Sequence, residues 1–447
     1  MILKALFERI PAVLCQGSWD TDIASIAMCS KEVTNNSLFI CIKGMEQDGH
    51  QYIQEAAERG AAACLVEEVF WKKSASVHGN LKQPEKKTSA YGELKLPEQM
   101  TIVSVQNTRE AAAWAAAAFY RYPSKELKVI GITGTKGKTS TTFMIRDILE
   151  AAGYKTGLLG TIDYEIGEEK KRAERTTPEA IDIQRYLRKM AESGCRFAVM
   201  EVSSQGLKLH RSDGILFDVG VFTNLGRDHI GPNEHKDFDD YKRCKGLLFK
   251  QCKLGIANVD DKYFKDVFKG STCKIETFGF SPEADLRAEN VELVSRPGYL
   301  GVAYHVAGVM DFDVEIDVPG KFSVYNSLTA ISVCRHFQVP VEMIKDALKK
   351  AKVKGRIEMI KVSDDFTLMI DYAHNAMSLE SLLTTLKEYN PKRLVCLFGC
   401  GGNRSKDRRF EMGEVSGRLA DLTIITSDNP RFEEPQDIIN DIKTGIA

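Results

Sequence analysis

The sequence has 447 residues, more than one ordinary domain holds, so two or three domains are expected. Apolar residues make up 43% and charged residues 28%, as in soluble globular proteins with sizeable cores. The formal net charge of −1 argues against a nucleic-acid partner held by bulk positive charge. No apolar run approaches the ~18–20 residues of a membrane-spanning helix, so no membrane partner is expected. The 11 cysteines are an odd number without paired spacing, which favours a reduced, cytoplasmic chain over a disulfide framework.

The first 123 residues mix strand-like apolar runs with helical patterns. "SLFICIKG" (37–44) has the composition of a strand, and an alanine-rich helix is expected over 107–123 with Asn107 as its N-cap. The polar, lysine-rich stretch 71–100 interrupts the pattern and is interpreted as a surface insertion.

Apolar runs of strand length alternate with helical patterns from Leu127 onward, and a second such series begins near Gly355. This alternation predicts a parallel sheet covered by helices on both faces, so the fold class is α/β. The expected strands are "LKVIGITG" (127–134), "FAVMEVSS" (197–204), "FDVGVFTNL" (217–225), "LGIANVDD" (254–261), "FTLMIDYAH" (366–374), "KRLVCLFGCGG" (392–402) and "DLTIITSDNP" (421–430).

Polar side chains gather where several of these strands end. Parallel α/β folds bind their ligands beyond the carboxyl ends of the strands, so an active site is expected at that edge. Four separate segments supply the candidate side chains, which are Lys138, Thr139, Glu201, Ser203, Ser204, Asn224, Asp228, His229, Asn258, Asp260 and Asp261.

The loop "GTKGKTS" (134–140) has the composition of a phosphate-binding loop. Gly134 and Gly137 would let backbone N–H groups face a phosphate, Lys138 would reach the outer phosphates and Thr139 would hold Mg²⁺. Ile132 stands where the standard P-loop has its first glycine, so the match is to a shorter variant. The alternative is an ordinary glycine-rich turn between a strand and a helix.

Glu201 and His229 are candidate metal ligands. Hard oxygen ligands favour Mg²⁺ over zinc, and a nucleotide on the neighbouring loop would bring Mg²⁺ with it. The alternative for a lone strand-end glutamate is a cap or a salt bridge.

Eight short motifs occur in a fixed order: "TGTKGKTST", "MEVSS", "FTNLGRDH", "NVDD", "PGKFSVYN", "GRIE", "DYAHN" and "SDNPR". From about residue 20 to the end, the chain thereby resembles the Mur ligases, and among them the UDP-N-acetylmuramoyl-tripeptide synthetases. The resemblance implies a UDP-sugar-binding α/β domain (1–124), a central P-loop ATPase domain with a parallel sheet (125–353) and a Rossmann-like amino-acid-binding domain (354–447). It also implies the reaction, in which ATP phosphorylates the terminal carboxylate of a UDP-linked peptide and an amine displaces the phosphate to form an amide.

The resemblance assigns roles residue by residue. The residues implied to hold ATP are Gly134, Thr135, Lys136, Gly137, Lys138, Thr139, Ser140, Asn326, Arg356 and Asp371. The residues implied to bind Mg²⁺ are Thr139, Glu201, His229 and Lys245, and those implied in catalysis are Lys138, His229 and Lys245. The residues implied to bind the UDP-N-acetylmuramoyl dipeptide are Ser30, Thr176, Thr177, Ser203 and Arg211, and those implied to bind the amino acid are Asp428, Asn429 and Arg431.

In this family a lysine after the "DH" motif is carbamylated. Lys245 in "YKRCKGLLF" matches it, and Lys242 is the near competitor. The alternative for both is an ordinary solvated lysine on a helix.

The sequence departs from the family pattern at several positions. Lys136 stands where Asn is common, Gln205 where "SSH" has its His, Ala376 where "DYAHNP" has its Pro, and "GPNEH" (231–235) is unusual after Asp228–His229. "CSK" replaces the uridine-site "DSR", so only Ser30 is carried over. These departures bear on the acceptor rather than on the ATP chemistry. The family also continues past "DNPR" with further helix and strand, so we expect the last domain to lack some tens of residues here.

The incoming amino acid is expected to be meso-diaminopimelate. Arg431 offers a planar fork suited to a second carboxylate, whereas L-lysine would bring an ammonium group there. The alternative for Arg431 is a helix cap or an ion pair with Glu433 or Glu434. "FGCGGNRSKDRR" (398–409) fails as a dinucleotide fingerprint because of Arg404, and the resemblance implies a loop beside the amino-acid site.

Rival functions remain open at this stage. A related ligase could add L-lysine or another amino acid, and folylpolyglutamate synthase and cyanophycin-type ligases share the superfamily. The UDP-sugar domain before residue 124 argues against the folate enzyme. A nucleotide-binding paralogue without ligase activity is the rival from another class. A monomer is expected.

Overall fold

The computed structural model describes the chain apart from residues 45–46, 73–98, 232–233, 297, 354, 356, 361, 364 and 447. The chain forms two compact units. The first comprises Met1–Thr142 and Gly153–Glu276, and the second comprises Phe143–Ala152 and Thr277–Ala447. Most of the predicted insertion at 71–100 and the predicted nucleotide contact Arg356 lie outside the described residues.

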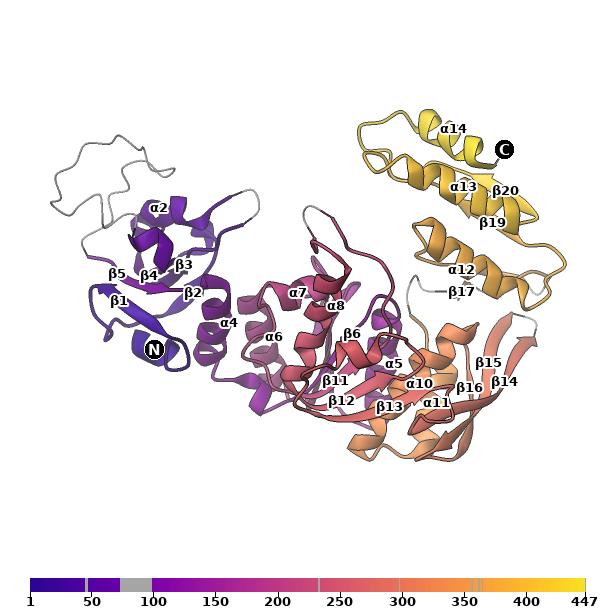
Figure 1. Ribbon diagram of the computed structural model, residues 1–447, viewed down its shortest axis with the longest axis horizontal. Coiled ribbons are helices and arrows are strands. Elements are labelled where there is room, and N and C mark those ends of the chain that lie inside the picture. Colours follow the sequence, from indigo (N-terminus) through magenta and orange to yellow (C-terminus); the bar gives the residue numbers. More distant parts are fainter. Residues whose placement is uncertain are drawn as a thin grey trace. The chain divides into compact units, whose positions relative to one another are not determined.

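The first unit begins with a five-stranded sheet in the order β1-β5-β4-β3-β2 (Figure 1). β1 pairs antiparallel with β5, and the other neighbours pair in parallel. Alternate strand residues enter two separate cores, with Leu38 packed beside helices α1 and α4 and Phe39 packed beside α2. The elements are α1 (Leu3–Leu6), β1 (Ala12–Gln16), β2 (Ser25–Ala27), η1 (Ser30–Glu32), β3 (Ser37–Ile40), η2 (Gly49–Tyr52), α2 (Ile53–Glu58), β4 (Ala61–Glu67), β5 (Thr101–Val105), α4 (Thr108–Phe119) and η3 (Pro123–Lys125).

Helix α4 confirms the predicted alanine-rich helix and its cap. The side chain of Asn107 accepts hydrogen bonds from the backbone N–H groups of Arg109 and Glu110, at 3.0 and 3.3 Å. The predicted C-terminal end was wrong, because the helix stops at Phe119. Arg121 and Tyr122 adopt φ values of +59° and +50°, a left-handed backbone that cannot continue a helix.

The larger sheet of the first unit has the strand order β12-β11-β6-β10-β7-β8-β9. Neighbours from β12 to β7 pair in parallel, and β8 and β9 are antiparallel additions. The four strands predicted between residues 127 and 261 are therefore confirmed. The strands are β6 (Lys128–Thr133), β7 (Thr156–Leu159), β8 (Asp163–Ile166), β9 (Glu169–Arg172), β10 (Phe197–Glu201), β11 (Phe217–Phe222) and β12 (Cys252–Asn258).

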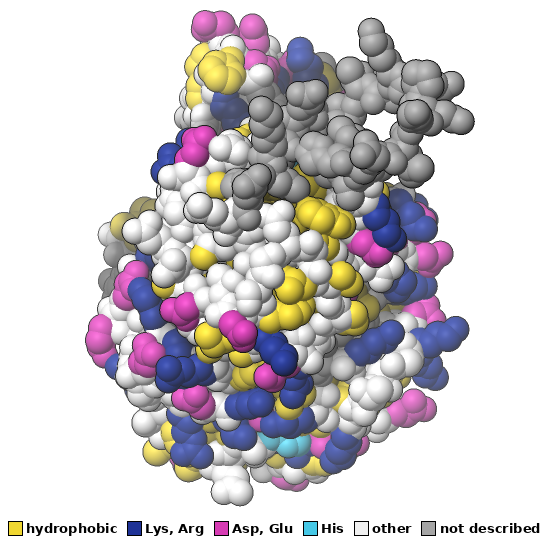
Figure 2. Space-filling model, turned by 90° about the vertical axis from the view of Figure 1, so that its left-hand side faces the viewer, with side chains coloured by type: hydrophobic (Ala, Val, Ile, Leu, Met, Phe, Trp, Pro, Cys, Tyr) yellow, Lys and Arg dark blue, Asp and Glu magenta, His cyan; other side chains and the backbone are white. Residues whose placement is uncertain are grey.

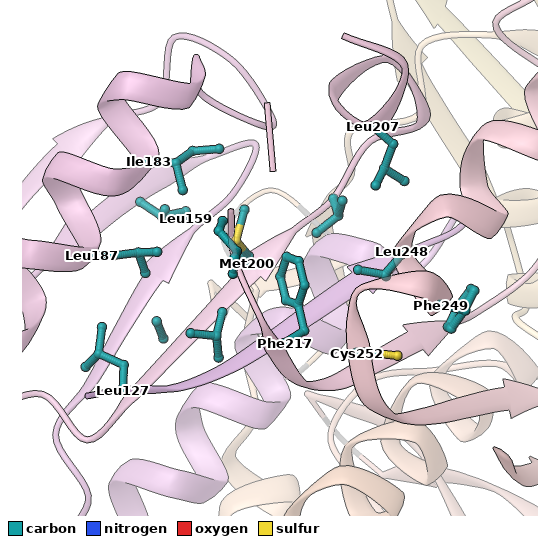
Figure 3. Close-up of a cluster of buried hydrophobic side chains, with 14 of the residues drawn as sticks. Leu127, Leu159, Ile183, Leu187, Met200, Leu207, Phe217, Leu248, Phe249 and Cys252 are labelled. Carbon is teal, nitrogen blue, oxygen red and sulfur yellow. The ribbon is translucent and has the colours of Figure 1, made fainter. Parts of the chain in front are cut away.

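Helices of the first unit cover this sheet with apolar side chains. Figure 3 shows Ile183 and Leu187 on helix α6 directed toward Leu159 and Met200 on the strands, in one buried cluster with Phe217. Such burial on a sheet face supplies the main stabilising term of a domain. The helices are α6 (Ala180–Glu192), α7 (Ser204–Lys208), α8 (Phe238–Gly246), η4 (Leu247–Lys250) and α9 (Phe264–Val267).

The second unit contains an antiparallel segment that was not predicted from the sequence. Its strand order is β16-β15-β14-β13, with β14 paired to β15 and β15 paired to β16 in antiparallel registers. The elements are β13 (Lys274–Gly279), β14 (Leu286–Arg296), β15 (Tyr299–Gly308), β16 (Phe312–Ile316), α10 (Lys321–Cys334), η5 (Arg335–Phe337) and α11 (Val341–Lys350).

The rest of the second unit alternates strand and helix from β18 onward, as predicted, whereas β17 was not predicted. β17 pairs antiparallel with β18, and β19 pairs in parallel with β20 across helix α13. One face of the β19–β20 pair is exposed, at Val395 (47%), Leu397 (63%), Leu422 (39%) and Ile424 (43%). The elements are β17 (Glu358–Ile360), β18 (Leu368–Ile370), α12 (Ala376–Lys387), β19 (Val395–Phe398), α13 (Asp407–Leu419), β20 (Leu422–Ile425) and α14 (Pro435–Ile446).

The surface carries no field of one charge sign on the face that Figure 2 shows. Lysine and arginine side chains alternate there with aspartate and glutamate side chains. This mixture agrees with the formal net charge of −1. Within the described part of the chain, no helix is long and apolar enough to cross a bilayer.

Candidate active site

The predicted phosphate loop, residues 134–140, joins β6 to helix α5 (Lys138–Ala151). A Cβ atom on Gly134 would lie 1.9 Å from Oγ1 of Thr223, so only glycine fits there. Gly137 has φ +84°, in the left-handed region that glycine adopts without strain. The loop thus passes directly into a helix N-terminus, where backbone N–H groups and the helix dipole favour an anion.

Residues after β11 fix the shape of the phosphate loop. Asn224 accepts from the N–H of Lys136 at 2.9 Å and donates to its carbonyl at 3.0 Å. Oγ1 of Thr223 donates to the same carbonyl at 2.7 Å. Asn224, which was singled out as a strand-end side chain, therefore holds the loop backbone in place.

Two lysine ammonium groups meet at one carbonyl of the phosphate loop. Nζ of Lys138 donates to the Gly134 carbonyl at 2.9 Å, and Nζ of Lys245 donates to the same oxygen at 2.8 Å. Lys245 is 1% exposed and makes no ion pair among the described residues. Burial lowers the pKa of Lys245 well below its ordinary value, and the nearby charge of Lys138 lowers it further. A buried ammonium without a carboxylate partner leaves the loop with uncompensated positive charge.

Helix α8 carries both candidates for the carbamylated lysine, and the two lie in different surroundings. Lys242 forms ion pairs with Asp266 at 2.9 Å and with Asp239 at 3.2 Å, and these raise its pKa. Lys245 contacts the phosphate loop instead. A lysine reacts with CO₂ through its neutral amine, so the environment of Lys245 suits carbamylation and that of Lys242 opposes it.

Glu201 ends β10 with its carboxylate almost fully buried, at 1% exposure. Oε1 accepts from the backbone N–H of Thr161 at 2.8 Å, and Oε2 accepts from the Thr161 hydroxyl at 3.0 Å. A Cβ atom on Gly160 would lie 2.7 Å from Oε1, so the chain before Thr161 closely approaches the carboxylate. Thr161 was not predicted as a site residue, because only the fold brings β7 beside β10.

His229 occupies a more open position than the sequence suggested. Its side chain is 52% exposed, and Nδ1 lies 3.0 Å from Oε1 of Glu234. Its backbone has φ +54°. Among the described residues, its ring hydrogen-bonds to Glu234 and lies 3.9 Å from Asp228, and it bonds to neither Glu201 nor the phosphate loop. The predicted pairing of Glu201 and His229 as metal ligands therefore stays a prediction.

The predicted dipeptide-binding residues form one network beside Glu201. The Thr177 hydroxyl donates to the Glu201 carbonyl at 3.0 Å and lies 3.1 Å from the Ser203 hydroxyl. The Arg211 guanidinium donates to the Thr177 carbonyl at 3.1 Å and pairs with Glu179 at 2.6 Å. Burial lowers the pKa of Arg211, and Glu179 opposes that shift.

Thr176 and Ser30 complete the predicted substrate set in the first unit. The Thr176 hydroxyl lies 3.1 Å from that of Thr161, so it belongs to the network around Glu201. Ser30 is 6% exposed and donates to Glu55 at 2.9 Å, in the N-terminal sheet domain. Glu179 was missed from the sequence, although it follows the predicted pair Thr176–Thr177 by two positions.

Helix α8 also carries a buried polar cluster that the sequence did not reveal. His235 lies 2.9 Å from the Ser204 hydroxyl through Nε2 and 3.2 Å from Asp240 through Nδ1. Lys208 and Arg243 pair with the Asp240 carboxylate at 2.9 and 2.8 Å. These partners tie α8 to the start of α7 at Ser204, three residues after Glu201.

This cluster has ligand types that metals use, since His235, Asp240 and Cys244 place one ligand atom each within 4.8 Å of one another. Burial raises the pKa of the Cys244 thiol to about 11, so it stays protonated near neutral pH. Lys208 and Arg243 already neutralise Asp240. The cluster is therefore a structural network and lacks the free anions that a cation needs.

Other polar residues at the strand ends form hydrogen bonds with backbone groups. Nδ2 of Asn258 donates to the Thr223 carbonyl at 2.8 Å, and Asp261 accepts from the N–H of Leu225 at 2.7 Å. Both support the segment that shapes the phosphate loop. The sequence placed them at the correct edge without showing that their role is structural.

The residues around the phosphate loop fit a magnesium nucleotide. Thr139 and Glu201 offer a hydroxyl and a carboxylate, the hard oxygen donors that Mg²⁺ prefers, and both are buried. The Thr133 hydroxyl at the end of β6 is buried and has no hydrogen-bond partner among the described residues. Gly134 lets the loop backbone pack directly against Thr223, where a side chain would clash.

Two predicted nucleotide contacts lie in the second unit. Asn326 is on helix α10, and Asp371 follows β18. The Asp371 carboxylate accepts from the backbone N–H groups of Ile357 and Ala373, at 2.9 and 2.8 Å. Its predicted contact with a ribose stays a prediction.

The predicted amino-acid residues lie in one loop of the second unit, residues 426–433, called here the acceptor loop. Asp428, Asn429 and Arg431 are all exposed. The Arg431 guanidinium makes no ion pair among the described residues. The alternative pairing with Glu433 is absent, because Glu433 pairs with Arg409 at 2.8 Å.

Three segments of the chain match sequence families of the Mur ligases. Residues 22–120 match the family described as "Mur ligase family, catalytic domain", residues 132–334 match "Mur ligase middle domain", and residues 355–447 match "Mur ligase, glutamate ligase domain". These segments fall inside the predicted domains 1–124, 125–353 and 354–447, whose boundaries stay predictions.

Curated relatives align with essentially the whole chain. The chain is 40% identical over 449 residues to UDP-N-acetylmuramoyl-L-alanyl-D-glutamate–2,6-diaminopimelate ligase 1 of Clostridium acetobutylicum, covering 100% of this chain and 87% of the relative. It is also 36% identical over 449 residues to UDP-N-acetylmuramoyl-L-alanyl-D-glutamate–2,6-diaminopimelate ligase of Clostridium perfringens. That alignment covers 99% of this chain and 87% of the relative.

A solved structure shares the fold. It is described as a UDP-N-acetylmuramoyl-L-alanyl-D-glutamate–2,6-diaminopimelate ligase and superposes with a TM-score of 0.73 at 24% identity. The similarity covers 100% of this chain and 86% of the other. The α/β fold class predicted from the sequence is thereby confirmed.

Proposed function

Since the chain belongs to the Mur ligase family, we propose that it is an ATP-dependent ligase that joins meso-diaminopimelate to UDP-N-acetylmuramoyl-L-alanyl-D-glutamate. The observation that carries the substrate assignment is the 36–40% identity, over nearly the whole chain, to relatives named for that reaction. The reaction would supply a precursor of peptidoglycan.

The chemistry begins with transfer of the ATP γ-phosphoryl group to a glutamate carboxylate of the dipeptide. A carboxylate oxygen attacks phosphorus and ADP leaves, so two anions must approach each other. Lys138 and the N-terminus of α5 would offset this repulsion through charge and backbone N–H groups. Bound Mg²⁺ supplies further positive charge to the phosphate oxygens, and Thr139, Glu201 and His229 are the residues proposed to hold it.

The second step forms the amide bond. The amine of the incoming amino acid attacks the acyl carbon, and phosphate departs with one oxygen of the former carboxylate. Arg211 and the hydroxyl groups of Thr176, Thr177 and Ser203 are proposed to orient the dipeptide, because they form one network around the end of β10. Holding reactants in this way replaces a bimolecular encounter with an oriented one.

We also propose that Lys245 is carbamylated and that the carbamate acts as an anionic metal ligand. Burial lowers the pKa of its amine and thereby favours the neutral form, which is the form that reacts with CO₂. The modification would place a negative charge beside Lys138, where the unmodified ammonium adds to the local positive charge. Lys242, with its two carboxylate partners, is the poorer candidate.

Arg431 supports the proposal for the amino acid. Its exposed guanidinium is free of ion pairs among the described residues and can bind a second carboxylate through two hydrogen bonds. Asp428 and Asn429 lie in the same loop and would shape the contact. We further propose that the enzyme acts as a cytoplasmic monomer without a nucleic-acid or membrane partner.

A phosphate-release assay tests the function. The protein is incubated with ATP, Mg²⁺ and a matrix of UDP-N-acetylmuramoyl peptides and amino acids. Release that requires the L-Ala-D-Glu dipeptide and meso-diaminopimelate together is expected. Equal turnover with L-lysine would overturn the amino-acid assignment, and ATP binding without any peptide-dependent release would support a paralogue without ligase activity.

A further inference from the structure

Arg409 is the largest fully buried side chain of the second unit, at 1% exposure on helix α13. Its guanidinium pairs with two carboxylates from different elements. Nη1 lies 2.8 Å from Oδ2 of Asp441 on α14, and Nη2 lies 2.8 Å from Oε1 of Glu433 in the acceptor loop. A buried guanidinium needs such partners, because an unpaired charge in the interior is strongly destabilising.

Helices α13 and α14, side by side in Figure 1, approach each other closely around this pair. A Cβ atom on Gly413 would lie 2.2 Å from the Ile442 carbonyl, and one on Gly445 would lie 2.0 Å from the Phe410 carbonyl. The backbone contact leaves little freedom for the helices to shift. Arg409 and Asp441 are therefore held at a fixed separation, and Glu433 is the partner contributed by a loop.

The acceptor loop is tied to a second loop, residues 399–405, called here the glycine loop. The N–H of Gly402 donates to the Asn429 carbonyl at 2.9 Å, and the N–H of Phe432 donates to Oδ1 of Asn403 at 3.3 Å. The backbone N–H of Asn403 donates to the same Glu433 oxygen that Arg409 contacts. The Glu433 carboxylate is thus held on the side of the glycine loop.

Arg431 lies only two residues before Glu433 and has the opposite charge. Such neighbours on a loop would ordinarily be expected to pair. Instead Arg409 and the backbone N–H of Asn403 both bond to Oε1 of Glu433, and the exposed Arg431 makes no ion pair among the described residues. Pairing with Arg409 lowers the pKa of Glu433 to about 2, so its carboxylate stays charged and would be an effective competitor for Arg431 if released.

We propose that Arg409 is a positioning residue that sequesters the Glu433 carboxylate and thereby keeps Arg431 available for the second carboxylate of the incoming amino acid. The inference rests on the proposed function, because it assigns Arg431 to that substrate. Without Arg409, Glu433 would pair with Arg431, and the substrate would have to displace it. The amino acid would bind more weakly while ATP and the dipeptide bound as before.

The test measures KM for meso-diaminopimelate, for ATP and for the UDP-dipeptide in full-length variants. Arg409→Met should raise KM for meso-diaminopimelate about 3- to 10-fold, since a competing exposed ion pair changes an equilibrium by a small factor. The other two KM values should stay unchanged. Arg409→Lys keeps one ion pair and should give a smaller increase in this KM. If Arg409→Met does not fold, Arg409→Lys is the variant to be measured.

A second substitution separates sequestration from a purely structural role. In Arg409→Met/Glu433→Gln the competing carboxylate is gone, so KM for meso-diaminopimelate should return toward that of the unmutated protein. Asp441→Asn breaks the other ion pair and leaves Glu433 held, so it should lower the melting temperature without changing this KM. Arg418→Met, an exposed arginine of the same helix paired with Glu380, is the matched control.

The outcomes distinguish the two proposals. No phosphate release with meso-diaminopimelate in the unmutated protein would overturn the proposed function and this inference with it. Normal release, together with an unchanged KM in the folded Arg409 variants or a double variant no better than Arg409→Met, would overturn the inference alone.

Discussion

The phosphate loop and the acceptor loop both follow strands of α/β segments, but the buried basic side chain beside each loop is paired differently. At the phosphate loop the buried amine of Lys245 contacts a backbone carbonyl and has no carboxylate partner among the described residues. In the second unit the buried cation Arg409 pairs with two carboxylates, and the exposed cation Arg431 makes no ion pair among the described residues. The difference indicates that the first site is prepared for multiply charged anions and the second for a single carboxylate reached from solvent.

The largest effect is expected from removing the phosphate-loop cation. Lys138→Ala should lower turnover about 10³-fold or more, because preorganised charge at a transferring phosphoryl group contributes several kcal/mol to the transition state. The melting temperature should change little. Lys128→Ala, an exposed lysine of β6 paired with Asp218, is the matched control. Near-normal turnover in Lys138→Ala would show that this loop is not the catalytic phosphate site.

The next effect distinguishes the two lysines of helix α8. Lys245→Ala should lower turnover by about 10²-fold or more, on the order expected for loss of one electrostatic contact at the reacting centre. A small carboxylic acid should restore part of the activity by replacing the carbamate. Lys242→Ala should keep nearly full activity. The reverse pattern would assign the modified lysine to position 242.

A smaller and more selective effect is expected at the acceptor loop. Arg431→Ala should weaken the use of meso-diaminopimelate by about 2 kcal/mol, the lower end for truncating one partner of a charge pair, because Arg431 is exposed in the free protein. Steady-state kinetics should show the loss in KM for the amino acid, with ATP binding unchanged. An equal loss for ATP would contradict the separation between the two loops.

The smallest effect is on stability in acid. The pKa of Glu433 is lowered to about 2, chiefly by its bond with Arg409. A depressed carboxyl pKa contributes stability that is complete above the unfolded value near 4.5 and is lost as the pH falls toward 2. The melting temperature of Glu433→Gln should therefore fall below that of the unmutated protein at pH 7, and the gap should narrow between pH 4.5 and 3. A constant gap across this range would contradict the assigned pairing.

The sequence predicted the parts of this comparison that depend on local pattern. A strand, two glycines and a lysine before a helix were sufficient to predict the phosphate loop, whereas Lys245 was carried over from the resemblance to the Mur ligases, with Lys242 as its competitor. The polar residues at the strand ends were placed at the correct edge because parallel strands share one carboxyl edge.

The remaining features depend on contacts between distant segments. Thr161 meets Glu201 across 40 positions of the sequence, and Ser204 meets His235 across 31. Arg409 bonds to Glu433 across 24 positions of the sequence. Because Arg431 lies only two positions from Glu433, the sequence suggested a pairing of these two residues, which the structure does not show among the residues it describes. The antiparallel strands between Leu286 and Ile316 were also missed, although they form a continuous meander.

The central claim is that the phosphate loop transfers a phosphoryl group to the dipeptide and that the acceptor loop delivers the amine that displaces it. Isotope transfer tests this directly. The dipeptide is prepared with ¹⁸O in its glutamate carboxylates, and the products are analysed by mass spectrometry after turnover with ATP and meso-diaminopimelate. One ¹⁸O atom in each released phosphate and an amide-linked tripeptide are expected. Unlabelled phosphate, or ¹⁸O in AMP, would contradict the account.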